Sequence, residues 1–305
     1  MKRLCMMIAV IVFLALHCPA YADSNAEKIL NAVVKIHSII PKDTPSTETL
    51  GTEREGNGVV IDAEGTILTL GFLVRDAETI DILGSEGEAV KATLTGYDYT
   101  TGFAILRTDK PLGVTPIIIG QSSTVKVGDP ILVAGFGGIE ATQLARIVSR
   151  KEFAWSWEYL LDEAIFTAPA TADFSGSALI NREGHLVGIG YLYTQVVIQG
   201  YGVLPGNMFI PIDLLAPILA DMKTAGRSLK LQRPWLGINA EESHDRIFIT
   251  KVTSGGPAEK AGLKPGDMVL MVDGKEVKDL TDFYLKAWGV CSAGGKGSSD
   301  CPSGR

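Results

Sequence analysis

The chain has 305 residues, of which 46% are hydrophobic and 21% are charged, and its formal net charge at pH 7 is -7. By length alone we expect two domains. The acidic balance argues against nucleic acid or an anionic membrane surface as a partner, because like charges repel.

The first residues have the pattern of a secretory signal peptide. A basic start at 1–3 precedes an almost wholly apolar run at 4–16, and Ala20-Tyr21-Ala22 forms an A-x-A cleavage site. We therefore expect residues 1–22 to be removed after Ala22 and the mature protein to be periplasmic or secreted. The apolar run is shorter than the roughly 20 residues that a transmembrane helix needs, and no later run approaches that length. The sequence thus predicts no stable insertion into a membrane.

From residue 26 to about 211, short β-rich runs alternate with Gly, Asp and Asn turns; examples are 32–40, 117–119, 131–134 and 184–193. Many short strands with such turns are typical of a sandwich or barrel. The period then changes, and apolar residues recur at helical spacing from Ile212 to Met222 before Gly226. This pattern predicts a helix over 211–225 that closes the domain, followed by a polar linker at 227–233.

Four blocks in this region follow one another in a recognisable order: G-N-G-V-V-I at 56–61, G-T-I-L-T-L-G-F-L-V at 65–74, T-G-F-A-I-L at 101–106 and D-F-S-G-S-A-L-I-N at 173–181. In order and spacing they resemble blocks of HtrA-type (DegP-like) serine proteases, which read G-S-G-x-(V/I)-I, G-x-I-L-T-N-x-H-V, T-D-L-A-V-L and G-N-S-G-G-A-L-V-N. The resemblance implies a trypsin-like domain of two packed six-stranded barrels over 23–226, with the crossover near 116–120.

The same comparison shows where the chain departs from the family. Phe72 stands at the position of the histidine base, Gly102 at that of the triad aspartate, and Asp173 at that of the oxyanion-hole glycine; Ser175 keeps the position of the nucleophile. A serine hydroxyl is a weak nucleophile without a base, and removal of a triad member costs about a millionfold in kcat in subtilisin. Loss of one oxyanion donor costs about 3–4 kcal/mol more. The triad is degenerate, as in a pseudoprotease.

Three histidines could substitute for the missing base, namely His37, His185 and His244. His37 lies in a predicted strand, His185 in the turn after the nucleophile strand, and His244 in an acidic loop, so position alone favours none of them. No local signature of a Ser-Lys dyad and no His/Cys spacing typical of a metal site occurs. We therefore expect no metal and no cofactor.

From residue 234 onward the chain resembles a PDZ domain of the HtrA type. The carriers of this resemblance are W-L-G-I at 235–238 and G-G-P-A-E-K-A-G-L-K-P-G-D at 255–267, with a predicted strand at 247–252 and a groove helix at 280–288. The resemblance implies that the loop of Trp235, Leu236, Gly237 and Ile238 presents backbone N–H groups to the carboxylate of a peptide C-terminus.

The last residues, 291–305, contain no large apolar side chain. Such a stretch cannot bury enough apolar area to offset roughly 1–2 kcal/mol of backbone ordering per residue, so we expect it to be disordered. The PDZ domain would then comprise 234–290 and be truncated at its C-terminal side.

The sequence thus predicts a mainly β protein, a trypsin-like double β-barrel followed by an α+β PDZ domain. Two functions remain open. The first is a periplasmic pseudoprotease, a homotrimer by resemblance, that binds peptides or unfolded proteins with free C-termini in quality control or regulates an active relative. The second is a weak serine endopeptidase that uses Ser175 with a non-standard base.

Overall fold

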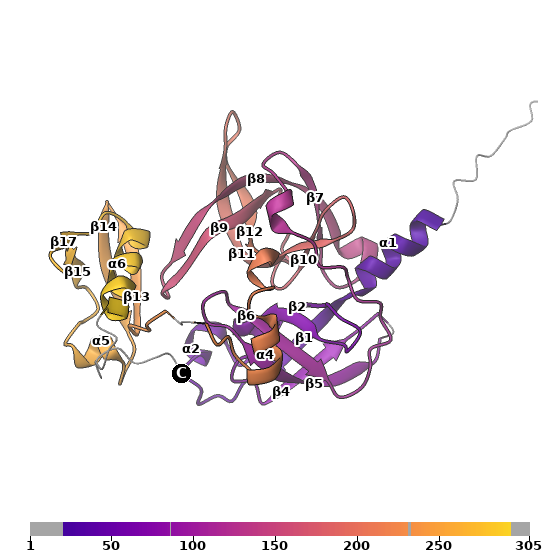
Figure 1. Cartoon of the computed structure of the whole chain (residues 1–305), viewed down its shortest axis with the longest axis horizontal. Helices are drawn as coiled ribbons and strands as arrows, with labels where there is room; N and C mark the ends of the chain where they lie inside the picture. Colours follow the sequence, from indigo (N-terminus) through magenta and orange to yellow (C-terminus); the bar gives the residue numbers. More distant parts are fainter. Residues whose placement is uncertain (1–20, 86, 231–232, 294–305) are drawn as a thin grey trace, which may run out of the picture.

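The computed structural model describes residues 21–85, 87–230 and 233–293, and it confirms the predicted fold class (Figure 1). Two closed barrels are followed by a smaller α+β unit. The predicted signal segment lies outside the described residues up to position 20, and helix α1 (Tyr21–Asn31) leads into the first barrel. Among the described residues, no helix is long and apolar enough to cross a membrane.

The first barrel closes in the order β1-β2-β3-β6-β5-β4, with all neighbours antiparallel. Its strands are β1 (Val33–Ile39), β2 (Glu53–Val60), β3 (Ile67–Leu70), β4 (Thr79–Leu83), β5 (Ala89–Tyr97) and β6 (Phe103–Thr108), and its short helices are α2 (Thr47–Leu50) and α3 (Gly71–Val74). The four residues of β3 are all buried, as expected for a strand inside a barrel wall covered on both faces.

The second barrel closes in the order β10-β11-β12-β9-β8-β7. Its strands are β7 (Pro130–Ala134), β8 (Thr142–Trp155), β9 (Tyr159–Ala168), β10 (Ala178–Ile180), β11 (Leu186–Ile198) and β12 (Gly202–Pro211), with 3-10 turns η1 (Ser122–Thr124) and η2 (Gly138–Ala141). The predicted strand at 117–119 is wrong, because Ile119 makes only an isolated bridge to Leu186 in the segment that joins the barrels.

The predicted helix over 211–225 forms only in part. The chain makes a 3-10 turn η3 (Ile212–Leu214) and then helix α4 (Leu219–Ala225), which ends at Gly226 in a left-handed conformation with φ 71°. Pro217 explains the interruption, because it lacks an N–H group and disfavours helical backbone in the residue before it. Helix α4 packs on β5, and the Gly226 carbonyl accepts a hydrogen bond from the N–H of Tyr97. Helix α4 therefore covers part of the first barrel.

The C-terminal unit contains a three-stranded sheet in the order β13-β14-β15 and a separate strand pair β16-β17. Its elements are β13 (Ile238–Ser243), β14 (Arg246–Val252), α5 (Pro257–Lys260), β15 (Met268–Val269), β16 (Met271–Val272), β17 (Lys275–Glu276) and α6 (Leu280–Ala293). Helix α6 thus extends five residues past the predicted end and three residues into the predicted disordered tail; residues 294–305 of that tail lie outside the described part. Within a helix these residues are ordered by backbone hydrogen bonds, so order there does not require large apolar side chains.

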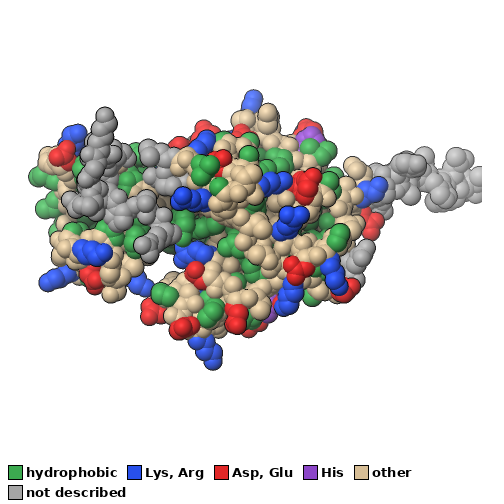
Figure 2. Space-filling view, turned by 60° about the horizontal axis from the view of Figure 1, so that its bottom comes forward, with side chains coloured by type: hydrophobic (Ala, Val, Ile, Leu, Met, Phe, Trp, Pro, Cys, Tyr) green, Lys and Arg blue, Asp and Glu red, His purple; other side chains and the backbone are tan. Residues whose placement is uncertain are grey.

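The apolar core has one cluster centred on the first barrel and its contact with the second, one within the second barrel, and one in the C-terminal unit. The last cluster includes Leu160 of β9, which is 1% exposed. In Figure 1 the β8–β9 hairpin extends from the second barrel to β13. On the face shown in Figure 2, acidic and basic side chains are intermixed rather than gathered by sign.

Candidate functional site

Phe72 lies in the short helix α3 directly after β3, at the position that the family resemblance assigns to the histidine base. Arg54 is 5% exposed, and its guanidinium holds this turn, donating from Nη1 to the Phe72 carbonyl at 2.7 Å and from Nη2 to Ser46 Oγ at 2.8 Å. Burial lowers the pKa of Arg54, which the nearby carboxylate of Asp76 partly offsets. The Phe72 ring is partly buried and lies edge-on to Tyr191, with 5.9 Å between ring centroids.

Gly102 lies in the turn before β6 with φ 82° and is buried. Its N–H donates to the Asp98 carbonyl at 2.8 Å, and its carbonyl accepts from the N–H of Gly71 at 2.8 Å. A Cβ at this position would lie 3.6 Å from the ring of Tyr191 and 3.7 Å from that of Tyr159. The position of the triad aspartate therefore faces aromatic rings.

Ser175 lies in the turn before β10 and is half-buried. The buried amide of Asn57, on β2, fixes this turn: Nδ2 donates to Asp173 Oδ1 at 2.9 Å and to the Ser175 carbonyl at 3.1 Å, and Oδ1 accepts from the N–H of Phe136 at 2.8 Å. Asp173 does not adopt a positive φ, contrary to the expected glycine conformation, and its carboxylate packs against Gly135.

These positions are distant in sequence but meet around β11. Tyr191 contacts Phe72, and it faces Gly102. The preceding residue, Gly190, accepts a hydrogen bond from the N–H of Gly176 at 2.8 Å, so it abuts the Ser175 turn. The structure thus places Phe72 and Gly102 beside Tyr191 and the Ser175 turn beside the adjacent Gly190. Among the described residues, no hydrogen bond reaches Ser175 Oγ from any side chain.

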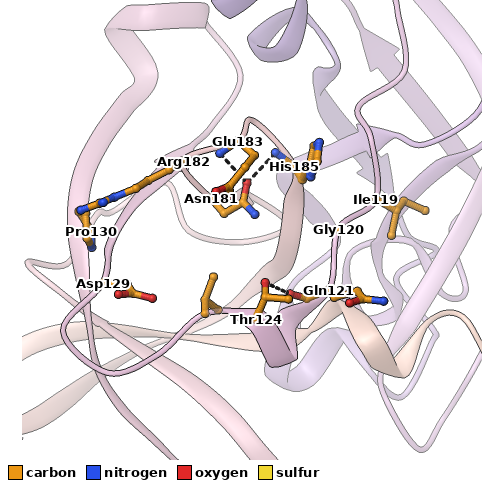
Figure 3. Close-up of a pocket in the computed structure, with 11 residues that line it drawn as sticks. Ile119, Gly120, Gln121, Thr124, Asp129, Pro130, Asn181, Arg182, Glu183 and His185 are labelled. Atoms are coloured by element: carbon orange, nitrogen blue, oxygen red, sulfur yellow. Dashed lines mark hydrogen bonds between the residues drawn. The ribbon is translucent and has the colours of Figure 1, made fainter.

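The histidines considered as substitutes have other surroundings. His37 Nε2 lies 2.6 Å from Glu53 Oε1, and His244 Nδ1 lies 3.0 Å from Ser243 Oγ. His185 borders a pocket of about 650 Å³ between the η1 turn and the turn at 181–185, whose wall does not include Ser175 (Figure 3). In that turn the Asn181 side chain accepts the N–H of His185 at 2.9 Å, a structural contact.

One polar cluster was not visible in the sequence. The antiparallel register of β1 and β2 brings His37, Glu53 and Glu55 close enough for their ligand atoms to lie within 4.8 Å of one another. Lys35 Nζ lies 2.8 Å from Glu55, so the cluster already contains a cation. Both glutamates are exposed, and such acidic groups are common on strand surfaces.

The loop predicted to bind carboxylates holds one in the structure. Glu158, in the turn between β8 and β9, accepts at Oε2 from the N–H of Leu236 at 2.7 Å, and at Oε1 from those of Gly237 at 2.7 Å and Ile238 at 3.1 Å. Trp235 is 40% exposed. Burial raises the pKa of Glu158, although the three N–H donors favour its charged form. No motif in the sequence points to Glu158.

Comparisons with known proteins agree with this architecture. A family model described as a trypsin-like peptidase domain matches residues 56–189, and one described as a PDZ domain matches residues 234–295. A "Probable periplasmic serine endoprotease DegP-like" from Hahella chejuensis is 28% identical over 235 residues, and a "Putative protease Do-like 14" from Arabidopsis thaliana is 27% identical over 262 residues. The chain thus has a trypsin-like domain followed by a PDZ domain, and it is similar to HtrA-type proteases.

The alignments with these two relatives cover 73% and 74% of the HtrA-like chain but 49% and 58% of the relatives. The chain thus spans about half the length of the curated relatives it matches. Among solved structures, "HtrA-type protease AlgW with tripeptide" is 23% identical with a TM-score of 0.54, covering 86% of this chain and 85% of that one. A structure titled "HtrA-type protease AlgW with decapeptide" is 22% identical with a TM-score of 0.51, covering 84% of this chain and 87% of that one. At this identity the likeness concerns the fold.

Proposed function

We propose that this HtrA-like chain is a secreted or periplasmic pseudoprotease whose PDZ domain binds the free C-termini of peptides or unfolded proteins. Its role would be in protein quality control or in regulating an active relative. The domains of this proposal are a barrel domain at 23–226 after a signal peptide at 1–22, a linker at 227–233 and a PDZ domain at 234–290. We infer a homotrimer from the family resemblance.

The surroundings of Ser175 are the main support for the proposed lack of catalytic activity. A nucleophilic serine needs a base within about 3.2 Å of its hydroxyl, and the residue at the base position is an aromatic ring packed on Tyr191. The aspartate position is a glycine that faces two tyrosine rings. Asp173, at the oxyanion position, brings a carboxylate near the place where negative charge would develop.

The observation that supports peptide binding is the loop at 236–238, whose three N–H groups converge on one carboxylate. Such convergent donors are the usual means of capturing a C-terminal carboxylate. Helix α6 and strand β13 flank the loop, as the two walls of a peptide groove do.

Hydrolysis of unfolded casein tests the proposal directly. The purified protein should show no activity above that of a Ser175→Ala variant, because both lack a base. Activity that the Ser175→Ala variant lacks would overturn the pseudoprotease assignment.

The second candidate, a weak serine endopeptidase, is favoured by one observation. Ser175 is retained in a turn and is not fully buried. Stoichiometric labelling of Ser175 by a fluorophosphonate, absent in Ser175→Ala, would support this alternative. A lack of labelling would support the pseudoprotease.

A further inference from the structure

The β8–β9 hairpin contacts the PDZ domain along the same surfaces that a peptide would use. The hairpin strands pair up to Trp155 and Tyr159, so its loop consists of residues 156–158. The Ala240 N–H, on the strand β13, donates to the Ser156 carbonyl at 2.9 Å. An extended peptide that adds to a PDZ sheet uses such main-chain bonds.

Helix α6, on the other side of this groove, also binds the hairpin. The hydroxyl of the buried Tyr284 donates to the carbonyls of Trp155 at 2.8 Å and Ser156 at 3.0 Å, and it accepts from the N–H of Glu158 at 3.2 Å. Beyond the loop, Leu160 enters the PDZ core, and its carbonyl accepts from Arg233 Nη1 at 2.7 Å. The hairpin therefore contacts strand, helix and core of the PDZ domain.

The backbone at Glu158 provides a separate argument. Its φ is 60°, in the left-handed region, at the end of a three-residue hairpin loop. Glycine or asparagine is favoured at such a position, because a larger side chain is strained there. A glutamate in this conformation indicates that the side chain has a role that the turn itself does not require. That role is visible in the three N–H donors around its carboxylate.

We propose that the β8–β9 hairpin is an internal ligand of the PDZ domain, in which the Glu158 carboxylate occupies the place of a peptide's terminal carboxylate. A peptide or protein with a free apolar C-terminus must displace this hairpin to bind. This inference rests on the proposed function of the PDZ loop, because it assigns to the hairpin the regulation of peptide binding there.

Displacement of the β8–β9 hairpin would also change the surroundings of Phe72. The ring centroid of Trp157, in the hairpin loop, lies 6.4 Å from that of Tyr191. The ring of Tyr159 stacks on that of Tyr191, with 4.9 Å between centroids. Tyr191 in turn contacts Phe72. Release of Glu158 from the PDZ loop therefore frees the tip of an aromatic cluster that ends at the former base position.

The test compares the full chain with Glu158→Ala and with Glu152→Ala, a matched change at an exposed position of the same hairpin. Calorimetry would follow a synthetic decapeptide ending in three valines, with a free or an amidated C-terminus. We expect the free peptide to bind Glu158→Ala at least tenfold more tightly than it binds the wild type and Glu152→Ala. Amidation should weaken binding to Glu158→Ala.

Hydrogen exchange provides a readout that does not depend on the peptide. The amides of Leu236, Gly237 and Ile238 should be protected in the wild type and should exchange at least tenfold faster in Glu158→Ala, but not in Glu152→Ala. Equal exchange in all three proteins would overturn the internal ligand, as would equal peptide affinity. Faster exchange without peptide binding would instead overturn the proposed function and leave the hairpin contact supported.

Discussion

At the scale of single residues, apolar packing surrounds two of the positions that the family resemblance assigns to catalysis. Phe72 and Gly102 both face Tyr191, so the space of an imidazole and a carboxylate is lined by aromatic surface. Arg54 fixes the carbonyl of Phe72, and Asn57 fixes the Ser175 turn through the carboxylate of Asp173. We therefore expect that replacing Phe72 and Gly102 by the family's residues is not sufficient to build a catalytic site.

We predict that Phe72→His combined with Gly102→Asp will not restore casein hydrolysis. The new carboxylate at 102 would start from a backbone with φ 82° and point at the rings of Tyr159 and Tyr191, which offer it no charge partner. The oxyanion turn would remain unchanged. Adding Asp173→Gly and Phe174→Asn should be necessary. Cleavage by the two-site variant would show that this turn is less important than we infer.

The same geometry gives Gly102→Asp alone a cost in stability. We expect the Gly102→Asp single variant to be destabilised by about 1–3 kcal/mol relative to the wild type, because its backbone is left-handed at 102 and its new carboxylate is desolvated. Urea unfolding measures this difference alongside the activity assay, so that an inactive but unfolded variant is recognised.

At the scale of elements, the β8–β9 hairpin links parts of the chain that are far apart in sequence. Its base reaches the first barrel, where the Tyr159 hydroxyl donates to the Thr101 carbonyl at 2.7 Å. Its tip reaches the PDZ loop through Glu158, and Tyr284 of α6 holds its backbone. The hairpin is therefore a structural connection between the two domains.

We predict that Tyr284→Phe lowers the free energy of unfolding by about 1–3 kcal/mol. The change keeps the ring but removes the hydroxyl, so the carbonyl of Trp155 and the N–H of Glu158 lose a buried partner. Tyr201→Phe is a suitable control, because Tyr201 is 79% exposed, and it should stay within about 0.5 kcal/mol of the wild type. Equal urea midpoints for both variants would contradict the role assigned to this hydroxyl.

At the scale of the whole molecule, Asp213 and Asp62 connect segments that are far apart in the sequence. Asp213, in η3, accepts the N–H groups of Ser122 at 2.6 Å and Ser123 at 2.9 Å in η1. Partial burial raises its pKa, but these hydrogen bonds outweigh it and lower the pKa overall. Asp62 is similar, since hydrogen bonds from Lys223 and Thr66 outweigh the effect of burial and lower its pKa overall.

The lowered pKa of Asp213 predicts a pH dependence of stability. Below the ordinary Asp pKa of about 3.9, the unfolded chain binds the proton more readily than the folded one, so the contribution of Asp213 is lost as pH falls through its folded pKa. Asp213→Asn should cost about 1 kcal/mol at pH 7, a low value because the carboxyl is partly screened by solvent. The cost should shrink in acid. Urea unfolding at several pH values measures it, with the exposed Asp43→Asn as control; a cost that persists in acid would contradict the assignment.

The sequence by itself determined the fold class and the positions to examine. Strand runs and turn residues predicted a sandwich or barrel, because such local patterns are set by neighbours along the chain. The resemblance of four ordered blocks to HtrA-type proteases implied the trypsin-like barrels, and the resemblance of W-L-G-I at 235–238 to a PDZ loop implied carboxylate binding. The helix predicted from periodicity at 211–225 is interrupted at Pro217. The disorder predicted from composition is wrong for the last three residues of α6.

The tertiary structure alone decided what surrounds those positions. No local pattern in the sequence indicates that Glu158 reaches a loop about 80 residues further on, or that Tyr191 lies close to both Phe72 and Gly102. Such contacts depend on barrel closure and on the docking of a second domain, which bring side chains together by geometry rather than by spacing. For this reason the motifs identified the PDZ loop, and only the folded chain showed the carboxylate that it binds.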